Sequence, residues 1–269
     1  MAWLSASPLR AQVTVGTEAV RERSDYHFDA PSSYDTNTLV PHFFEQHYVL
    51  DNLWVSAGLT YRAGARWNTS VAATPVRQAL ATDYDTFYDP GNIVWVAGTT
   101  GDAHVHSFRL TQAADIGVAG GIQWSGGYRL QMDVADFLAG DLTDTRNGEI
   151  IVRRIVTTAE HTNAQSHSVF VRATRVREFT KTWGLLISAD LSPATVDRLT
   201  IQLPDKYPGQ TLVYRAASLS AGGRVEFGRR GGTWPLALFA HAAHAWSYRS
   251  TQQATRSALG VGIEAGRAW

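Results

Sequence analysis

Long runs of strictly alternating side chains constrain this chain more than any other feature. Between residues 53 and 67, apolar or small side chains occupy every odd position, while the even positions include Arg62 and Arg66. Successive side chains of a β-strand point to opposite faces, so this period predicts a strand with one apolar and one polar face. Ordinary strands average about 5 to 6 residues, whereas a tilted membrane-spanning strand needs about 9 to 11. The run therefore favours strands that cross a membrane.

The alternation recurs in residues 108–118 and 122–134, which flank the small segment Ala119-Gly120-Gly121. Two alternating runs joined by a glycine pair predict a β-hairpin with a tight turn. The same reasoning places further hairpin turns at Asp51-Asn52, near Thr180-Lys181 and between residues 229 and 233.

The whole chain reads as about ten strands joined by short turns on one side and long polar connections on the other, the asymmetry of outer-membrane barrels. The expected strands are residues 10–22, 39–50, 53–71, 104–118, 121–137, 166–179, 182–191, 211–228, 234–249 and 256–269. The expected long connections are residues 25–37, 68–103, 138–165, 192–210 and 250–255. Residues 149–158 form either an extra hairpin arm in the third connection or part of a twelve-stranded barrel. The predicted fold class is all-β, a single up-and-down antiparallel transmembrane barrel of ten strands, with twelve as the alternative.

The last strand carries a second indication. Apolar or small residues occupy Leu259, Val261, Ile263 and Ala265, and the chain ends on the aromatic Trp269. This pattern resembles the assembly signal of Gram-negative outer-membrane β-barrels, although Arg267 interrupts the apolar register. The resemblance implies a location in the bacterial outer membrane, contact with the lipid bilayer and its lipopolysaccharide, and recognition of the last strand by the barrel-assembly machinery.

Composition narrows the remaining possibilities. The formal net charge is zero, so no overall field attracts nucleic acid, and the absence of cysteine excludes disulfides, thiolate metal sites and a cysteine nucleophile. Residues 1–11 look like the remnant of a secretory signal, which leaves residues 12–269 as one barrel domain. No stretch is apolar for about 18 residues, so the chain has no transmembrane helix, and we expect no cofactor and no metal.

If the apolar positions face lipid, the opposite positions collect charges of both signs inside the barrel. Opposite charges in a narrow lumen predict an internal network of ion pairs that fills the barrel, while a solute path lined by these charges is the alternative. The predicted luminal residues are Glu18, Glu22, Arg62, Arg66, Arg109, Asp115, Arg129, Asp133, Asp190, Arg224, Glu226 and Glu264.

Two short acidic patterns are candidates for chemistry. Asp83 and Asp85 lie in a segment that reads as a polar loop, and carboxylates at this spacing suit turn chemistry, a Ca²⁺ ligand set or the orientation of a water. Asp102 and His104 share one face of the following strand, where they suit either the wet rim of the barrel or a carboxylate-imidazole pair. Together with the barrel size, these patterns resemble the omptins, outer-membrane proteases that use an aspartate pair facing an Asp-His pair. The resemblance implies that Asp83 and Asp85 hold the attacking water and that Asp102 with His104 forms the dyad.

Three functions follow from these observations. The first is a non-enzymatic surface or channel-type barrel with a polar, largely plugged lumen and long extracellular loops that contact a ligand or partner. The second is an omptin-like hydrolase with its site at the extracellular rim. The third is a soluble secreted barrel that binds a small apolar ligand, which requires the apolar faces to point inward.

Overall fold

A computed structural model describes residues 12–30, 43–63, 67–88, 94–137, 140–156, 160–202, 211–229, 235–248 and 252–268. Within these ranges the chain forms twelve strands, and no helix is long and apolar enough to cross a membrane. The strands are β1 (Gln12–Ala30), β2 (Phe43–Ala63), β3 (Trp67–Tyr88), β4 (Val94–Ala119), β5 (Ile122–Phe137), β6 (Gly140–Arg146), β7 (Glu149–Val156), β8 (Glu160–Glu178), β9 (Trp183–Gln202), β10 (Leu212–Arg229), β11 (Leu236–Ser247) and β12 (Gln252–Ala268).

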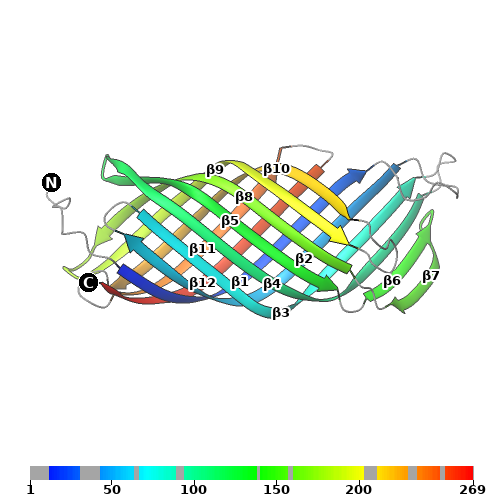
Figure 1. The fold of residues 1–269 in the computed structure, drawn as a ribbon, viewed down its shortest axis with the longest axis horizontal. Coiled ribbons are helices and arrows are strands. Elements are labelled where there is room, and N and C mark those ends of the chain that lie inside the picture. Colours follow the sequence, from blue (N-terminus) through cyan, green and yellow to red (C-terminus); the bar gives the residue numbers. More distant parts are fainter. Residues whose placement is uncertain are drawn as a thin grey trace.

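Ten of these strands close into a ring (Figure 1). Neighbours along the chain pair antiparallel, β12 pairs with β1, and β3 pairs with β4 to complete the circle. The remaining two strands, β6 and β7, form a hairpin that leaves the ring and pairs only on the far part of β4, opposite residues 95–100. The prediction of a ten-stranded antiparallel barrel with an extra hairpin arm in the third connection is confirmed.

The two ends of the barrel differ in their connections. One end, here called the turn end, carries both ends of the described chain, because Gln12 lies opposite Ala268. It also carries the tight turn between β4 and β5, where Gly120 and Gly121 adopt the left-handed φ angles of 60° and 75° that glycine tolerates. The opposite end, the loop end, carries the β6–β7 hairpin (Figure 1). The predicted turns at Gly120-Gly121 and near Thr180-Lys181 are therefore confirmed.

Several predicted boundaries are wrong. The predicted strands 39–50 and 53–71 are not separate strands, because residues 43–63 form β2 and β3 begins at Trp67, and others such as β1 continue further toward the loop end. Asp51 and Asn52 lie inside β2 instead of forming a turn, and the supposed loop at residues 68–103 is mostly β3 and β4. The ring strands have between 12 and 26 residues, against about 9 to 11 needed to cross a membrane. The barrel therefore extends well beyond the lipid on its loop side.

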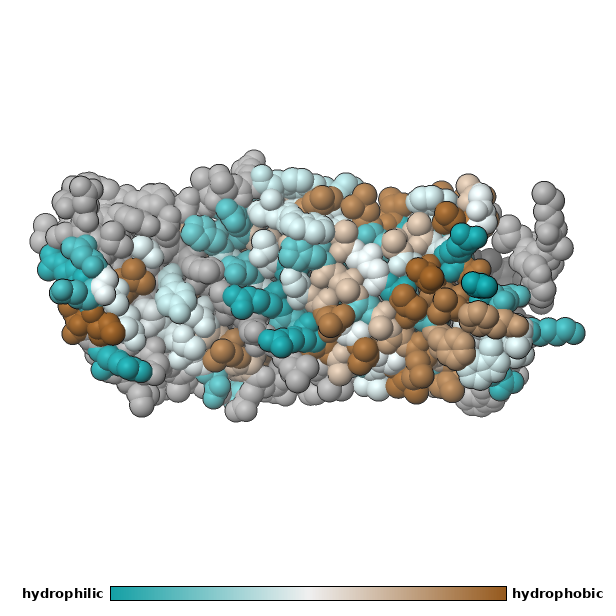
Figure 2. Space-filling view, turned by 180° about the vertical axis from the view of Figure 1, so that it is seen from behind, coloured by the Kyte–Doolittle hydropathy of each residue, from teal (hydrophilic) through white to brown (hydrophobic). Residues whose placement is uncertain are grey.

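The outer face of the turn-end half is apolar. Ile116 is 70% exposed and Leu259 is 63% exposed, and their neighbours on adjacent strands are also large and apolar. We call this zone the apolar belt; it includes Val15, Ile116, Val118, Val169, Val171, Ile187, Leu191, Val225, Phe227, Leu238, Leu259, Val261 and Ile263. In Figure 2, where the turn end lies on the right, hydrophobic surface gathers on that side, and hydrophilic patches lie near the middle and on the left. The soluble barrel is therefore excluded, because its apolar faces would have to point inward.

The inner face shows the opposite gradient. On β1 the inward positions change from Glu18 and Glu22 to Tyr26 and Phe28 as the strand rises toward the loop end. A cluster of buried apolar side chains, here called the apolar plug, fills the interior at that level and draws on eight of the ten ring strands. It consists of Tyr26, Phe28, Ala79, Ala81, Ala103, Val105, Ala135, Ala164, Leu199, Ile201, Tyr214, Ala216 and Ala254. The turn-end half is thus apolar outside and polar inside, whereas the loop-end half contains an apolar cluster beside a few buried polar residues such as Asp83 and Glu160.

Candidate functional site

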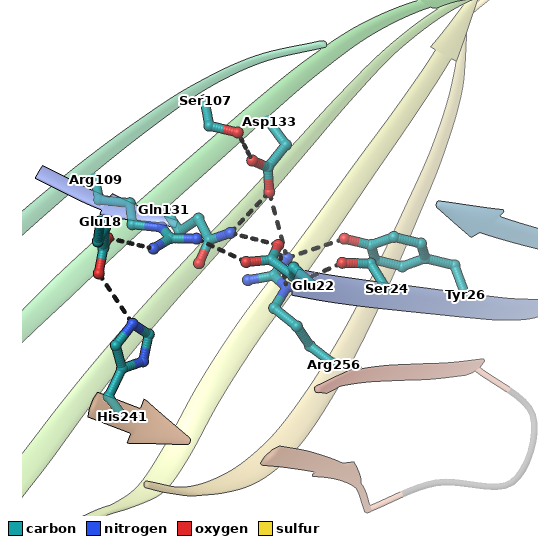
Figure 3. A network of polar contacts seen from close by, with 10 residues as sticks. All are labelled: Glu18, Glu22, Ser24, Tyr26, Ser107, Arg109, Gln131, Asp133, His241 and Arg256. Atoms are coloured by element: carbon teal, nitrogen blue, oxygen red, sulfur yellow. Dashed lines mark hydrogen bonds and ion pairs between the residues drawn. The ribbon is translucent and has the colours of Figure 1, made fainter. Parts of the chain in front are cut away.

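The polar interior of the turn-end half is organised around Glu22, whose side chain is 1% exposed (Figure 3). Its Oε2 accepts a hydrogen bond from Nη2 of Arg109 at 2.7 Å, and its Oε1 accepts one from Nε2 of Gln131 at 2.9 Å. Nε of Arg256 lies 3.9 Å from the same Oε1. Three strands on different sides of the ring, β4, β5 and β12, therefore meet β1 at a single carboxylate.

Asp133 is the second carboxylate of this network. It accepts hydrogen bonds from Ser107 and, at 2.9 Å, from Nε2 of Gln131. Arg256 lies 3.9 Å from it and also donates to Ser24 Oγ at 3.3 Å and to the Tyr26 hydroxyl at 3.0 Å. The Tyr26 ring belongs to the apolar plug, so Arg256 connects the charged interior to the plug above it.

Glu18 extends the network toward the turn end. Its Oε1 accepts a hydrogen bond from Arg109 at 3.4 Å, and its Oε2 lies 2.9 Å from Nε2 of His241 on β11. The luminal network thus consists of Glu18, Glu22, Ser24, Tyr26, Ser107, Arg109, Gln131, Asp133, His241 and Arg256, all drawn in Figure 3.

Two smaller ionic groups lie on other parts of the inner wall. Asp190 accepts two hydrogen bonds from Arg172, at 2.6 and 2.8 Å, and one from Arg129 at 2.8 Å. Phe170 lies beneath both guanidinium groups, 4.9 and 5.3 Å from their central carbons. The other group joins Arg224 to Glu264 at 2.8 Å and Glu226 at 3.3 Å. Asp115 accepts a hydrogen bond from Gln123 at 2.7 Å.

These contacts tie the lumen into a fixed structure. A buried charge is tolerated only when partners and hydrogen bonds compensate its lost hydration, and here each carboxylate receives at least one such bond. Arginine suits this role because its planar guanidinium presents several donors in fixed directions. The contacts cross-link strands that lie apart in the ring, such as β1 and β5.

Two adjoining cavities remain between these groups, of about 270 and about 470 Å³. Both are lined by Ser70, Thr111, Arg172 and Arg224, and the larger one reaches turn-end residues such as Pro235. The smaller cavity ends at Tyr26, the lowest aromatic ring of the plug. The described residues therefore line a polar chamber that belongs to the turn end and stops at the plug.

The structure separates the candidate catalytic residues. Asp83 lies within β3 rather than in a loop, and its side chain is 5% exposed on the inner side, while Asp85 lies on the same strand with a side chain outside the described set. On β4 the buried positions are Ala103 and Val105, so Asp102 and His104 point to the outer face of the wall. The structure therefore does not bring Asp102 and His104 together with Asp83, because the barrel wall lies between them. Among the described residues, no group of three metal-binding side chains is arranged to hold an ion.

Other predicted luminal residues lie outside what the structure describes. The side chain of Arg62 on β2 and the whole of Arg66 fall there, as do residues 1–11 and Trp269. The inner face also contains Arg172, His241 and Arg256, which were not predicted from the sequence. The alternation along β12 could have identified Arg256. It lies an even number of residues from Glu264, on the face opposite to the outward Leu259 and Val261. Tyr26 was missed because residues 25–37 were expected to form a loop.

Comparison with solved structures supports the architecture. The chain is similar in fold to the outer membrane protease OmpT from Escherichia coli, with a TM-score of 0.66 and 9% sequence identity over 99% of both chains. The β domain of the Bordetella autotransporter BrkA gives a TM-score of 0.41 and 12% identity, over 93% of this chain and 98% of that one. The translocator domain of the autotransporter NalP from Neisseria meningitidis gives 0.40 and 11%, over 96% and 88%.

No protein-family model matches the sequence, and the search of curated proteins gives no match. The likeness to OmpT therefore concerns the fold alone. The chain thus has the fold of an outer-membrane β-barrel, and its apolar belt is an exposed surface of the kind that faces lipid.

Proposed function

We propose that the protein is a non-conducting surface barrel that holds its loop end rigidly outside the membrane for contact with a ligand or partner. The observation that carries the proposal is the apolar plug, in which Phe28 stacks on Tyr214 with ring centroids 4.2 Å apart. An ion that crosses this layer would exchange most of its hydration for aromatic and aliphatic side chains, which is unfavourable. A rigid support suits contact loops because it fixes their positions at little cost in conformational entropy.

A conductance measurement tests the closed lumen. Wild-type protein in planar bilayers should give no stable current steps. Replacing Phe28, Leu199 and Tyr214 together by alanine should produce currents, since these are the largest side chains in the plug apart from Tyr26 and Ile201. Stable open-pore steps from the wild-type protein would contradict the proposal.

Epitope accessibility tests which end faces outward. A tag inserted between Asn147 and Gly148, in the turn of the β6–β7 hairpin, should bind antibody on intact cells. The same tag inserted between Gly120 and Gly121, in the β4–β5 turn, should bind antibody only after the outer membrane is permeabilised. Labelling in the reverse pattern would show that the loop end faces the periplasm.

A hydrolase is the second candidate, and the fold it shares with the protease OmpT is what favours it. The buried Asp83 near the loop end is the carboxylate that such an activity would use. The test is digestion of a mixed peptide library by protein in lipopolysaccharide-containing micelles, analysed by mass spectrometry. Cleavage that disappears in Asp83→Asn and persists in Asp102→Asn would establish the enzyme, while an unchanged library favours the surface barrel.

We also propose the two partners implied by the last strand and the belt, namely the barrel-assembly machinery and lipopolysaccharide. The outward row Leu259, Val261 and Ile263 on β12 supports the first, since these side chains are 40 to 63% exposed. Their replacement by serine should slow the appearance of folded barrel in the outer membrane while the precursor accumulates in the periplasm.

A further inference from the structure

Two arginines face each other on the outside of the barrel wall. Arg198 on β9 lies directly opposite Arg215 on β10, and both side chains are exposed. Directly opposite residues in antiparallel strands have Cα atoms about 4.5 to 5.5 Å apart, and like charges at this spacing destabilise the sheet. Gln165 on β8 lies opposite Arg198 on its other side, which completes a lateral row of three hydrogen-bond donors.

Nothing in the described part of the chain neutralises this pair. Neither guanidinium has an ion-pair or hydrogen-bond partner there. The acidic residues of β9 and β10 all turn inward: Asp190 and Asp197 make luminal hydrogen bonds, and Glu226 bonds Arg224. The outer face of these two strands therefore carries an uncompensated double positive charge.

The height of the pair on the wall is defined by its neighbours. Below Arg215, the outward positions of β10 are apolar or small until Arg229 at the turn-end limit of the strand; they are Ala217, Leu219, Ala221, Gly223, Val225 and Phe227. Below Arg198 lies Val196, which is 52% exposed. Trp246 and Tyr248 are exposed near the loop-end limit of β11, and the Tyr248 hydroxyl bonds the Pro193 carbonyl on β9. Tryptophan and tyrosine concentrate where hydrocarbon meets headgroups, so the pair lies at the upper boundary of the apolar belt.

We propose that Arg198 and Arg215 form a binding site for a phosphate group carried by an outer-leaflet lipid, with Gln165 as an additional donor. A phosphate presents several acceptor oxygens and matches the fork of a guanidinium, and its negative charge removes the repulsion between the two arginines. A lipid is the source because its headgroups occupy the level of the pair. The site is independent of whether the barrel is a surface protein or a hydrolase, since it lies on the lipid-facing wall.

The test is binding of fluorescent diphosphoryl lipid A to the folded barrel in neutral detergent, compared with the same lipid after removal of its phosphates. Arg198→Gln/Arg215→Gln should weaken binding of diphosphoryl lipid A at least tenfold, since charge-assisted hydrogen bonds are worth about 1.5 to 3 kcal/mol and 1.4 kcal/mol is tenfold. The single variants should not be additive, because both arginines hold one phosphate. Arg198→Lys/Arg215→Lys should fall between, because lysine keeps the charge and loses the fork.

Arg175→Gln is the matched control, since Arg175 is an exposed arginine on the neighbouring strand β8 near the turn end, opposite Ile187. It should bind lipid A as the wild type does. Heat-modifiable migration on gels confirms that each variant is folded, and the lysine variant provides the comparison if the glutamine variant fails to fold. Equal binding of phosphorylated and dephosphorylated lipid, or unchanged binding by the double variant, would overturn the proposal. Stronger competition by inorganic phosphate than by lipid A would assign the pair to a free anion and would overturn it as well.

Discussion

At the scale of single residues, the alternation of inward and outward positions along a strand decides whether a charged side chain lies in the lumen or on the outer wall. Arg109, Arg129, Asp133 and Arg224 lie inside because their strand neighbours on either side are lipid-facing, and the sequence alone indicated this. Which charges meet could not be read from this alternation, because Glu22 contacts residues 87 and 109 positions away and also Arg256, which lies near the other end of the chain. Such contacts depend on the ring closure and on the tilt of its strands.

The Glu22 carboxylate gives the first prediction at this scale. Glu22→Gln removes the charge shared by Arg109 and Arg256, and breaking a buried ion pair in this way costs about 3 kcal/mol. Urea unfolding in lipid vesicles, followed by tryptophan fluorescence, measures the loss. Glu178→Gln, at an exposed position at the end of β8, should change the free energy of unfolding by less than about 0.5 kcal/mol. A loss below 1 kcal/mol for Glu22→Gln would mean that the network is not a major source of stability.

Glycine 262 provides a steric prediction. A Cβ there would lie 2.3 Å from the Phe239 ring and 2.6 Å from the Thr17 carbonyl oxygen, so Gly262→Ala should destabilise the barrel by about 1 to 3 kcal/mol. Gly117 has no atom within 4 Å of the corresponding position, and Gly117→Ala should be tolerated. The same urea titration compares the two variants, and equal midpoints would show that the strands shift to make room.

At the scale of elements, the alternation rule predicted the turn-end parts of the strands correctly and failed for their loop-end parts. It rests on apolar side chains facing out, which holds for β5 and β12 in the belt. Above the belt the alternation is lost, since β3 turns the apolar Ala79 and Ala81 inward and also has the apolar Leu80 on its outer side. Polar segments such as residues 68–103 therefore looked like loops. Asp51 and Asn52 have the composition of a turn, but they lie within β2, where the pairing with β3 is irregular.

The β6–β7 hairpin should be dispensable for the ring. β4 keeps its pairing with β3 along its upper part, and β5 pairs with β8 without the hairpin. Deletion of residues 140–156 should therefore leave the circular dichroism spectrum and the heat-modifiable migration of the barrel unchanged. Binding of a ligand or partner that contacts the hairpin would be lost. A deletion variant that stays unfolded in the same refolding conditions would show that the hairpin takes part in closing the ring.

At the scale of the whole molecule, the apolar belt determines where the bilayer lies. Val261→Arg places a charge in the belt, which costs about 2 to 4 kcal/mol at the middle of a bilayer. Val213→Arg makes the same change on the loop-end side of Arg215 and should cost little, because that surface is exposed to water or headgroups. Unfolding titrations in vesicles measure both. A similar loss in detergent and in vesicles for Val261→Arg would argue against its contact with hydrocarbon.

The change from an apolar exterior at the turn end to a charged exterior at the loop end also affects how the protein inserts into the membrane. In the proposed orientation the loop-end half crosses the bilayer first, and its exterior carries exposed charges such as Arg23, Asp102 and Arg215. Moving such groups through hydrocarbon is expensive, with about 2.5 to 3.5 kcal/mol for a single charge even by the mildest scales. A fully folded barrel of this kind is therefore not expected to insert spontaneously from the periplasm. Translocation before the core has condensed, strand by strand and shielded from the acyl chains, avoids that barrier.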